Sequence, residues 1–239
     1  TECQLGRAHF FAERNRLSFF RFASNNFAYP ALWHDCQIFE NDLEINDSQP
    51  VSWNKERQLN SNLIVKSGSI LHINCDVFMP NDGKIIVEPN AQLVINAKIT
   101  AQCDYWAGIE VWGGPGSQYV VNGGRAQGYL RMLSGAMIEN AVTGVKLYGP
   151  TENESGGILI ATGATFIDNA VSVEYAPFDN YWPFSGDPTD PEPRDYISSF
   201  NNCDFIVGSI PNLPVGFEAM VKMNGVNGVT FRGCNFENT

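Results

Sequence analysis

The feature that most constrains the fold is a segment that repeats itself after 22 residues. Residues 64–74 match residues 86–96 in kind at most positions, so that Leu71 falls over Leu93. Within each copy apolar residues alternate with others at a period of two, which is the pattern of a strand with one buried face. One copy cannot bury that face alone, and successive copies must stack with their strands about 4.8 Å apart. The repeat therefore predicts an all-β chain folded as a right-handed parallel β-helix.

Later parts of the chain carry the same pattern with longer insertions between the matching runs. Residues 134–142 resemble residues 162–171, and residues 200–205 resemble residues 231–236 at an offset of 31. A solenoid built in this way places like residues over like residues along its length. We therefore expect coils over residues 61–239.

The ends of the repeat region lead to two expectations about domain organisation. Residues 1–60 lack the repeat and are interpreted as an N-terminal cap or linker, because an uncovered first coil would expose apolar core and unpaired strand edges. Residues 10–20 are the one candidate helix in that segment. The sequence stops at Thr239 directly after a strand-like run, and a solenoid needs a capping element there. We expect the β-helix of residues 61–239 to continue in a longer protein.

Turn residues bracket the inner strand in each of the first two copies. Gly68 and Asn90 precede the strand, at a position where a turn often needs a positive φ. Asn74 and Asn96 follow the strand and are placed to form a ladder of stacked amides. These positions add turn chemistry to the repeat and mark where one strand ends and the next begins.

Six cysteines form an even set whose pairing the spacing does not determine. None belongs to a CxxC pair and only three histidines are present, which argues against a structural zinc site. The match between residues 200–205 and 231–236 stacks Cys203 on Cys234, either as a disulfide or as a ladder of thiols. We expect free thiols, because strand positions in register seldom meet disulfide geometry.

Nearly all of the excess negative charge lies in one segment. The net charge of the chain is −11, and residues 151–204 carry ten acidic side chains against one basic side chain, Arg194. A chain with no basic stripe is a poor partner for nucleic acid, because binding to phosphates depends on displacing their counterions. No run approaches the roughly 20 consecutive apolar residues of a membrane-spanning helix, so direct membrane insertion is not expected either.

Two long loops are the places where a rigid scaffold usually carries function. Residues 113–127 are rich in glycine and are interpreted as turn-like, whereas residues 176–196 hold five prolines and several acids. The acids carry the hard oxygen ligands that calcium prefers, and the candidates for calcium or ligand binding are Asp179, Asp187, Asp190, Glu192 and Asp195. Their spacing matches no EF-hand loop, and the alternative is a solvated acidic loop that aids solubility. No cofactor other than calcium is indicated.

Aromatic residues in and near the same loop are candidates for carbohydrate binding. Tyr181 and Trp182 lie in the loop, where an exposed ring can stack on the apolar face of a pyranose. Trp106 and Trp112 bracket a predicted strand, and a place in the core is the stronger interpretation for these two and for Tyr105. The sequence leaves both interpretations open.

The sequence contains no recognised catalytic motif. It has no nucleophile elbow, no HExxH and no phosphate-binding loop. Glycoside hydrolysis needs two carboxylates about 5–9 Å apart, a condition that many pairs in a stacked solenoid could meet. Arg194 is the local candidate for the base of a lyase, with an ion pair as the alternative. By the alternation, His72 is expected to point outward next to Val94.

Four runs, taken in order, resemble a known family. They are residues 103–113, 126–141, 199–205 and 226–236. The set is similar to the β-helix region of large secreted proteins from Bacteroidetes, which commonly end in a type IX secretion sorting domain and belong to the pectate-lyase-like superfold. The resemblance covers residues 61–239 and implies a secreted or outer-surface location. It implies no catalytic residues, and membership of a superfold does not supply a function.

Two functions follow as hypotheses. The first is a non-catalytic extracellular or cell-surface module, adhesin-like or structural, within a larger secreted protein. Its partners would be other domains or chains of the same surface assembly, together with glycans. The alternative is a polysaccharide-active enzyme, a lyase or hydrolase, with a site near residues 176–196. A groove with converging carboxylates would favour the enzyme hypothesis. A face of the β-helix without such a groove would favour the non-catalytic module.

Overall fold

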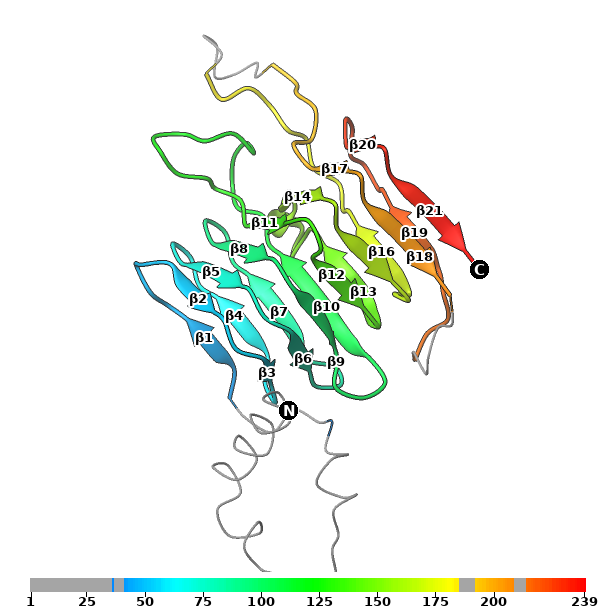
Figure 1. The fold of residues 1–239 in the computed structure, drawn as a ribbon. Helices are drawn as coiled ribbons and strands as arrows, with labels where there is room; N and C mark the ends of the chain where they lie inside the picture. Colours follow the sequence, from blue (N-terminus) through cyan, green and yellow to red (C-terminus); the bar gives the residue numbers. More distant parts are fainter. Residues whose placement is uncertain (1–35, 37–40, 185–191, 209–213) are drawn as a thin grey trace, which may run out of the picture. The chain divides into compact units, whose positions relative to one another are not determined.

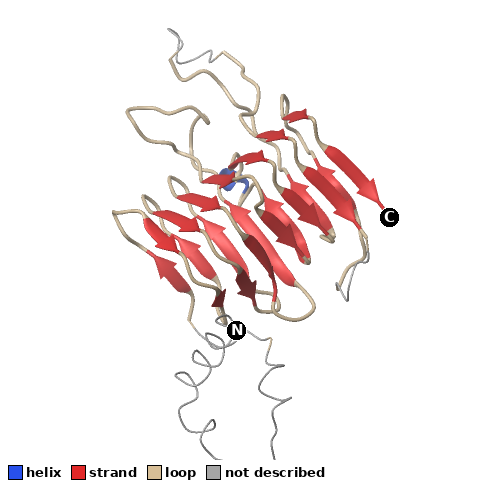
Figure 2. Ribbon diagram, in the orientation of Figure 1, coloured by secondary structure: helices blue, strands red, loops and turns tan. Residues whose placement is uncertain are grey.

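The computed structural model describes residues 36, 41–184, 192–208 and 214–239. In these residues, 21 strands and one short 3-10 helix wind into a right-handed parallel β-helix, in which each coil contributes one strand to each of three parallel sheets. Figure 1 shows the successive strands of a sheet lying side by side along the stack. Figure 2 shows that strands make up nearly all of its regular structure. The predicted fold class is confirmed.

Every third strand belongs to the same sheet. The first sheet consists of β1 (Leu43–Ile45), β4 (Leu63–Val65), β7 (Lys84–Val87), β10 (Trp106–Val111), β13 (Ala141–Lys146), β16 (Val171–Glu174) and β19 (Ala219–Lys222). The second sheet consists of β2 (Val51–Trp53), β5 (Ile70–Ile73), β8 (Gln92–Ile95), β11 (Tyr129–Met132), β14 (Ile158–Thr162), β17 (Ser199–Asn201) and β20 (Thr230–Arg232). The third sheet consists of β3 (Arg57–Gln58), β6 (Val77–Met79), β9 (Lys98–Ala101), β12 (Met137–Glu139), β15 (Thr165–Ile167), β18 (Asp204–Val207) and β21 (Asn235–Asn238). The 3-10 helix η1 (Glu152–Glu154) follows β13.

A column of apolar side chains runs through the stack, as the repeat predicts. In the second sheet Leu71 pairs with Leu93 of the next coil. Leu130 then pairs with Leu93 on one side and with Leu159 on the other. All four side chains are completely buried. Because burial of apolar surface contributes about 25 cal/mol per Å², each coil is stabilised mainly by covering the core of its neighbour.

The β-helix begins earlier than the predicted boundary at residue 61. Residues 43–58, which the interpretation of residues 1–60 placed in a cap or linker, form β1, β2 and β3. Leu43 pairs with Leu63, an offset of 20 residues, so this coil is shorter than the next one. A comparison of the sequence at an offset of 22 cannot align it, which is why the repeat was not visible there. The candidate helix at residues 10–20 lies outside the described residues.

The turns before the inner strands have the expected backbone conformation. Gly68 and Asn90 both have positive φ, with values of 83° and 63°. The backbone N–H of Gly68 donates to the carbonyl of Asn90, which ties the two turns together. The side chain of Asn74 donates to Asn54 of the preceding coil at 3.0 Å, whereas the amide ladder between Asn74 and Asn96 stays a prediction. Turn residues therefore stack in the same way as core residues.

The described cysteines are used in two ways. Cys36 and Cys103 form a disulfide bond, with their Cα atoms 6.1 Å apart. Cys203 and Cys234 are free, as expected for like positions in neighbouring coils, and so is Cys75. Burial raises the pKa of the Cys75 and Cys203 thiols. A raised pKa lowers the thiolate fraction, so these thiols are less reactive than an exposed cysteine.

Phenylalanine replaces aliphatic residues in the later coils. Phe166, Phe205 and Phe236 occupy one position of the third sheet, with stacked rings 4.9 Å and 4.7 Å apart. Phe200 and Phe231 repeat the arrangement in the second sheet at 4.6 Å. Phe205 is completely buried, whereas Phe236 is 49% exposed. The same position is therefore part of the core in β18 and open to solvent in β21.

This difference provides a matched pair of variants. We expect Phe205→Ala to lower the free energy of unfolding by about 3–5 kcal/mol, because it empties a buried aromatic site. Phe236→Ala should cost far less, because much of that side chain is already in water. Urea denaturation followed by circular dichroism measures both. Equal losses for the two variants would contradict the place of Phe205 in the core.

Candidate functional site

Two long loops leave the coil stack on the same side. The first loop, residues 113–127, connects β10 to β11, and the second loop, residues 176–196, lies between β16 and β17. Figure 1 shows both projecting from the same end of the coils. The loops are far apart in the sequence, so contacts between them define a site that neither could form alone.

Gln118 holds the two loops together. Its side chain is completely buried and makes two hydrogen bonds. It donates to the carbonyl of Gly156 at 2.9 Å and accepts from the backbone N–H of Ile197 at 2.8 Å. The backbone N–H of Gln118 donates to the side-chain oxygen of Asn180 at 3.0 Å. Such buried bonds are costly to break, because the groups left behind have no water to bind.

Residues 180–182 and 192–194 of the second loop pair with each other as a two-stranded antiparallel ribbon. Trp182 donates its backbone N–H to the carbonyl of Glu192 at 2.8 Å. Arg194 donates its own N–H to the carbonyl of Asn180 at 2.9 Å. Because neighbouring residues of an extended strand point to opposite sides, Tyr181 and Trp182 face different sides of the ribbon. The two aromatic candidates therefore belong to two surfaces.

Two glycines allow the ribbon to pack closely at its base. A Cβ atom at Gly156 would overlap the ring of Phe178, and a Cβ atom at Gly228 would overlap the side chain of Asp195. Both glycines have positive φ, with values of 100° and 80°, which other residues rarely adopt. The path of the second loop thus depends on the absence of side chains in the coils beneath it.

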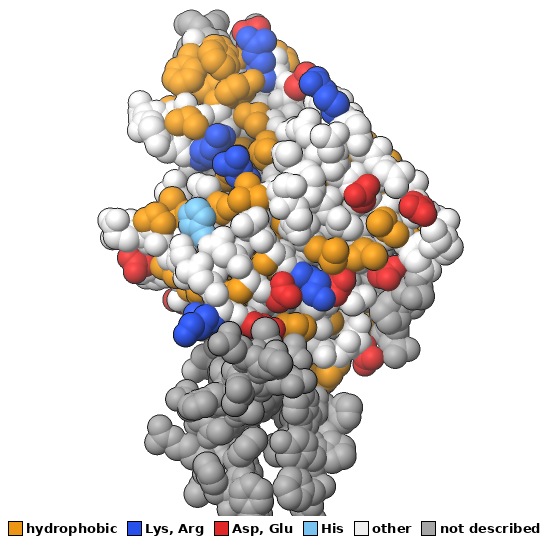
Figure 3. All heavy atoms as spheres, in the orientation of Figure 1, with side chains coloured by type: hydrophobic (Ala, Val, Ile, Leu, Met, Phe, Trp, Pro, Cys, Tyr) orange, Lys and Arg blue, Asp and Glu red, His pale blue; other side chains and the backbone are white. Residues whose placement is uncertain are grey.

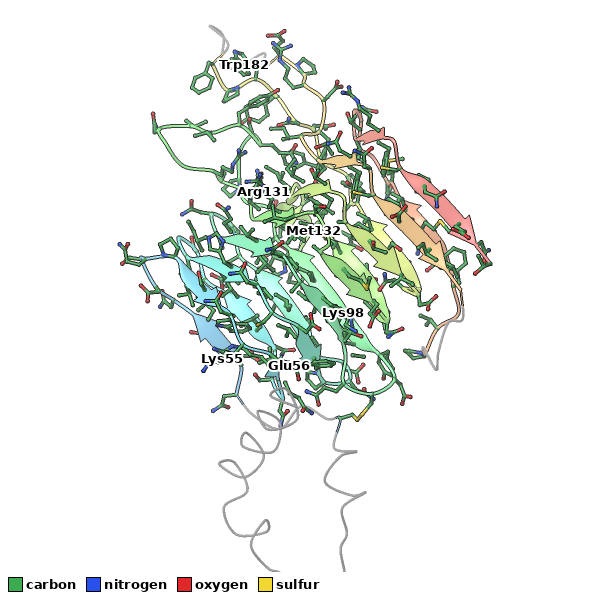
Figure 4. All side chains as sticks on the ribbon, viewed as in Figure 1. Lys55, Glu56, Lys98, Arg131, Met132 and Trp182 are labelled. Carbon is green, nitrogen blue, oxygen red and sulfur yellow. A yellow bond between two sulfur atoms is a disulfide. The ribbon has the colours of Figure 1, made fainter. Side chains whose placement is uncertain are left out.

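Trp182 is the centre of an aromatic cluster that both loops build. Its ring contacts Tyr119 of the first loop at 4.9 Å and Phe184 of the second loop at 5.3 Å, both edge to face. The guanidinium of Arg194 lies 5.5 Å from the centre of the Trp182 ring, in a cation–π contact. Phe184 is 56% exposed, and Val120 beside Tyr119 is 44% exposed. We call Tyr119, Trp182 and Phe184 the aromatic platform. Figure 3 shows apolar side chains gathered at this end, and Figure 4 labels Trp182 there.

A cavity of about 330 Å³ lies beside the ribbon. The residues that line it are Phe178, Asp179, Asn180, Tyr181, Pro193, Arg194, Tyr196 and Asn227. Tyr181 therefore faces this cavity, whereas Trp182 belongs to the aromatic platform. Arg194 is shared between the two, because it lines the cavity and also contacts the ring of Trp182.

The three predicted acidic candidates that the structure describes make different contacts. Asp187 and Asp190 lie outside the described residues. Asp179 lines the cavity, and Glu192 forms an ion pair at 2.9 Å with the neighbouring arginine of the ribbon. Asp195 packs against a glycine of the last coils. In the described part of the chain no group of three or more His, Cys, Asp or Glu side chains is placed to hold a metal ion. Calcium binding stays a prediction for the loop as a whole.

Residues 118–121 belong to the site and were not identified from the sequence. The glycine-rich composition of residues 113–127 indicated a turn, and Asn122 and Gly123 do form a tight turn there with positive φ. The run of polar, aromatic and β-branched residues at 118–121 is the signal for a site, because a segment that only forms a turn does not need such residues. The partner of that run lies 62 residues away, and only the folded chain reveals it.

Trp106 and Trp112 make structural contacts, and His72 lies where the alternation predicts. Trp106 is completely buried and donates its ring N–H to a backbone carbonyl at 2.9 Å. Trp112 donates its ring N–H to the carboxylate of Glu110 at 2.9 Å. His72 pairs with Val94 on the outer face of the second sheet, as the alternation predicts. The core interpretation therefore holds for Trp106.

The outer face of the first sheet carries a ladder of alternating charges. Glu110, Lys146, Glu174 and Lys222 occupy successive strands in register. Lys146 lies 3.7 Å from Glu110, and Lys222 lies 4.0 Å from Glu174. Burial raises the pKa of Tyr148 to about 12, with a further contribution from the negative charge of Glu174. Because these charges are paired with each other, this face is a weaker candidate for ligand binding than the loops.

Comparison with protein-family models, curated proteins and solved structures finds no match for the chain. Among the residues that the structure describes, no helix has the length and apolar character needed to cross a membrane.

We expect Gln118→Ala to loosen the two loops without unfolding the coils. The substitution leaves a buried N–H and a buried carbonyl without partners, which costs about 1–3 kcal/mol for each group. Amide hydrogen exchange should become faster at Ile197 and Trp182, while the amides of β5 and β8 keep their protection. Gln92→Ala, at a half-buried glutamine of β8, is the control. Unchanged exchange in the loops would show that Gln118 does not hold them.

The raised pKa of Tyr148 should make stability fall at alkaline pH. The unfolded tyrosine loses its proton near pH 10 and the folded one near pH 12, so unfolding releases a proton within this window. The contribution of Tyr148 is complete below pH 10 and is lost as the pH rises towards 12. Tyr148→Phe should therefore flatten the decline of the urea midpoint over this range. An identical pH profile in the variant would argue against the raised pKa.

Proposed function

We propose that the protein is a non-catalytic binding module of a secreted or cell-surface protein, and that its two loops attach it to glycans. The observation that carries this proposal is the aromatic platform. Rings from both loops contact one another, Gln118 fixes the loops from beneath, and Phe184 is more than half exposed. A solenoid suits this role, because a rigid scaffold holds long loops in a constant geometry.

The composition of the platform favours a sugar as the ligand. Aromatic side chains have an apolar face on which the C–H groups of a pyranose ring can pack. Arg194 is held by its contact with Trp182 and by its ion pair with Glu192, and it has further N–H donors for hydroxyl groups. Exposed apolar residues rimmed by polar groups commonly mark interaction sites on soluble proteins. A ligand that combines apolar faces with hydroxyl groups matches this surface.

The proposal includes the setting in which the module works. The disulfide bond between Cys36 and Cys103 is typical of proteins in oxidising compartments, which supports a secreted or outer-surface location. The resemblance to β-helix regions of secreted Bacteroidetes proteins supports attachment through a type IX sorting domain of a longer chain. The partners of the module are then other domains or chains of the same surface assembly.

The test is binding of the purified chain to a panel of immobilised neutral and acidic polysaccharides, measured by biolayer interferometry. We expect Trp182→Ala and Phe184→Ala each to weaken binding about tenfold, because each removes a ring on which a sugar stacks. Phe236→Ala, which removes a comparably exposed ring of β21, is the control and should bind like the unmodified chain.

Three outcomes would contradict this proposal. Binding that survives both platform substitutions would remove the platform from the interaction. Binding to no polysaccharide in the panel would exclude a glycan-attachment role. Release of new reducing or unsaturated ends from a polysaccharide, abolished by Asp187→Ala and Asp190→Ala together, would establish the alternative function, a lyase or hydrolase.

A further inference from the structure

The cavity beside the ribbon lies on the side that Tyr181 faces and adjoins the aromatic platform through Arg194. Its volume of about 330 Å³ is at the lower end of the range for small-molecule pockets. A space of that size suits a short ligand of one or two rings and cannot enclose a long chain. Arg194 connects the two surfaces, because its guanidinium contacts Trp182 on the platform while the residue lines the cavity.

One wall of the cavity is aromatic. Phe178, Tyr181 and Tyr196 line it, and the rings of Phe178 and Tyr196 meet edge to face at 5.9 Å. Tyr196 is nearly completely buried, and its hydroxyl donates to the carbonyl of Gly157 at 2.6 Å. The hydroxyl of Tyr181 extends towards Gly116 of the first loop. This wall therefore offers mainly ring surface to a ligand.

The other residues that line the cavity include two polar side chains that make no hydrogen bond within the described residues. Asn180 is satisfied, because its amide donates to the carbonyl of Asp195 at 2.7 Å and its oxygen accepts from Gln118. Asp179 and Asn227 are exposed, and within the described residues no hydrogen bond occupies either side chain. The cavity thus holds a free carboxylate and a free amide next to the arginine that it shares with the platform.

We propose that the cavity binds one neutral pyranose residue of the glycan that lies on the platform, and that Asp179, Asn227 and Arg194 bind its hydroxyl groups. This inference rests on the proposed function. Neighbouring hydroxyls need acceptors and donors together, and a carboxylate, an amide and a guanidinium supply both. A uronic acid fits less well, because Arg194 already pairs with Glu192 and the remaining charge of the cavity, on Asp179, would repel the ligand carboxylate.

The experiment uses the whole chain with soluble ligands. Oligosaccharides of a bound neutral polysaccharide, the corresponding monosaccharide and glucuronic acid are titrated by calorimetry. We expect Asp179→Ala and Asn227→Ala each to weaken binding of the neutral oligosaccharide about tenfold, the effect of losing one charged or strong hydrogen bond. Asp204→Ala, at an exposed carboxylate of β18, is the matched control and should have no effect. Glucuronic acid should bind more weakly than the neutral monosaccharide.

The outcomes separate this inference from the proposed function. If Trp182→Ala abolishes binding while Asp179→Ala and Asn227→Ala bind normally, the cavity does not take part and the platform still does. If the intact chain binds no glycan, both are overturned. If glucuronic acid binds more tightly than the neutral sugar, the assignment of a neutral ligand is overturned.

Discussion

Burial of one coil by the next is the constraint on which the whole structure depends. No coil has a core of its own, and Leu93 is buried because Leu71 lies on one side of it and Leu130 on the other. The column survives only if the register is kept, since a shift by one residue would turn apolar side chains towards solvent. Added residues are therefore accepted where a turn can lengthen without disturbing the strands. The two long loops are insertions of this kind, and the aromatic platform is built from them.

The same constraint explains which parts of the fold could be predicted. Where consecutive coils have equal length, as at Leu71 and Leu93, like residues recur at a constant offset and the fold can be inferred by alignment. Cys203 and Cys234 could be matched because the run around them contains no insertion. The coil that begins at Leu43 was missed because it is shorter than its neighbour. Prediction thus succeeds where strand and turn lengths repeat and fails where a turn changes length.

The candidate site was predicted only in part, and the reason is also geometric. Trp182 could be selected because it lies in a long loop, although its own side chain is half-buried and Phe184 is the exposed ring. Tyr119 could not, because its contact with Trp182 depends on two insertions that leave the same side of the stack. The alternation of the ribbon, which separates Tyr181 from Trp182, depends in turn on hydrogen bonds made after the loop has folded. Composition indicated where a site would lie, whereas stacking and pairing decided which residues share it.

The way the loops are held has a consequence for how strongly such a site can bind. A buried glutamine and close-packed glycines fix the platform before any ligand arrives, so little conformational entropy remains to be lost on binding. Three rings and a cavity of about 330 Å³ nevertheless form a small contact, and small contacts with hydroxyl-rich ligands give weak affinity for a single site. A protein displayed in many copies on a surface overcomes this limit, because linked weak sites act together through their high effective concentration. A pre-formed but small site on a rigid solenoid is therefore better suited to attachment through many copies than to tight capture by one.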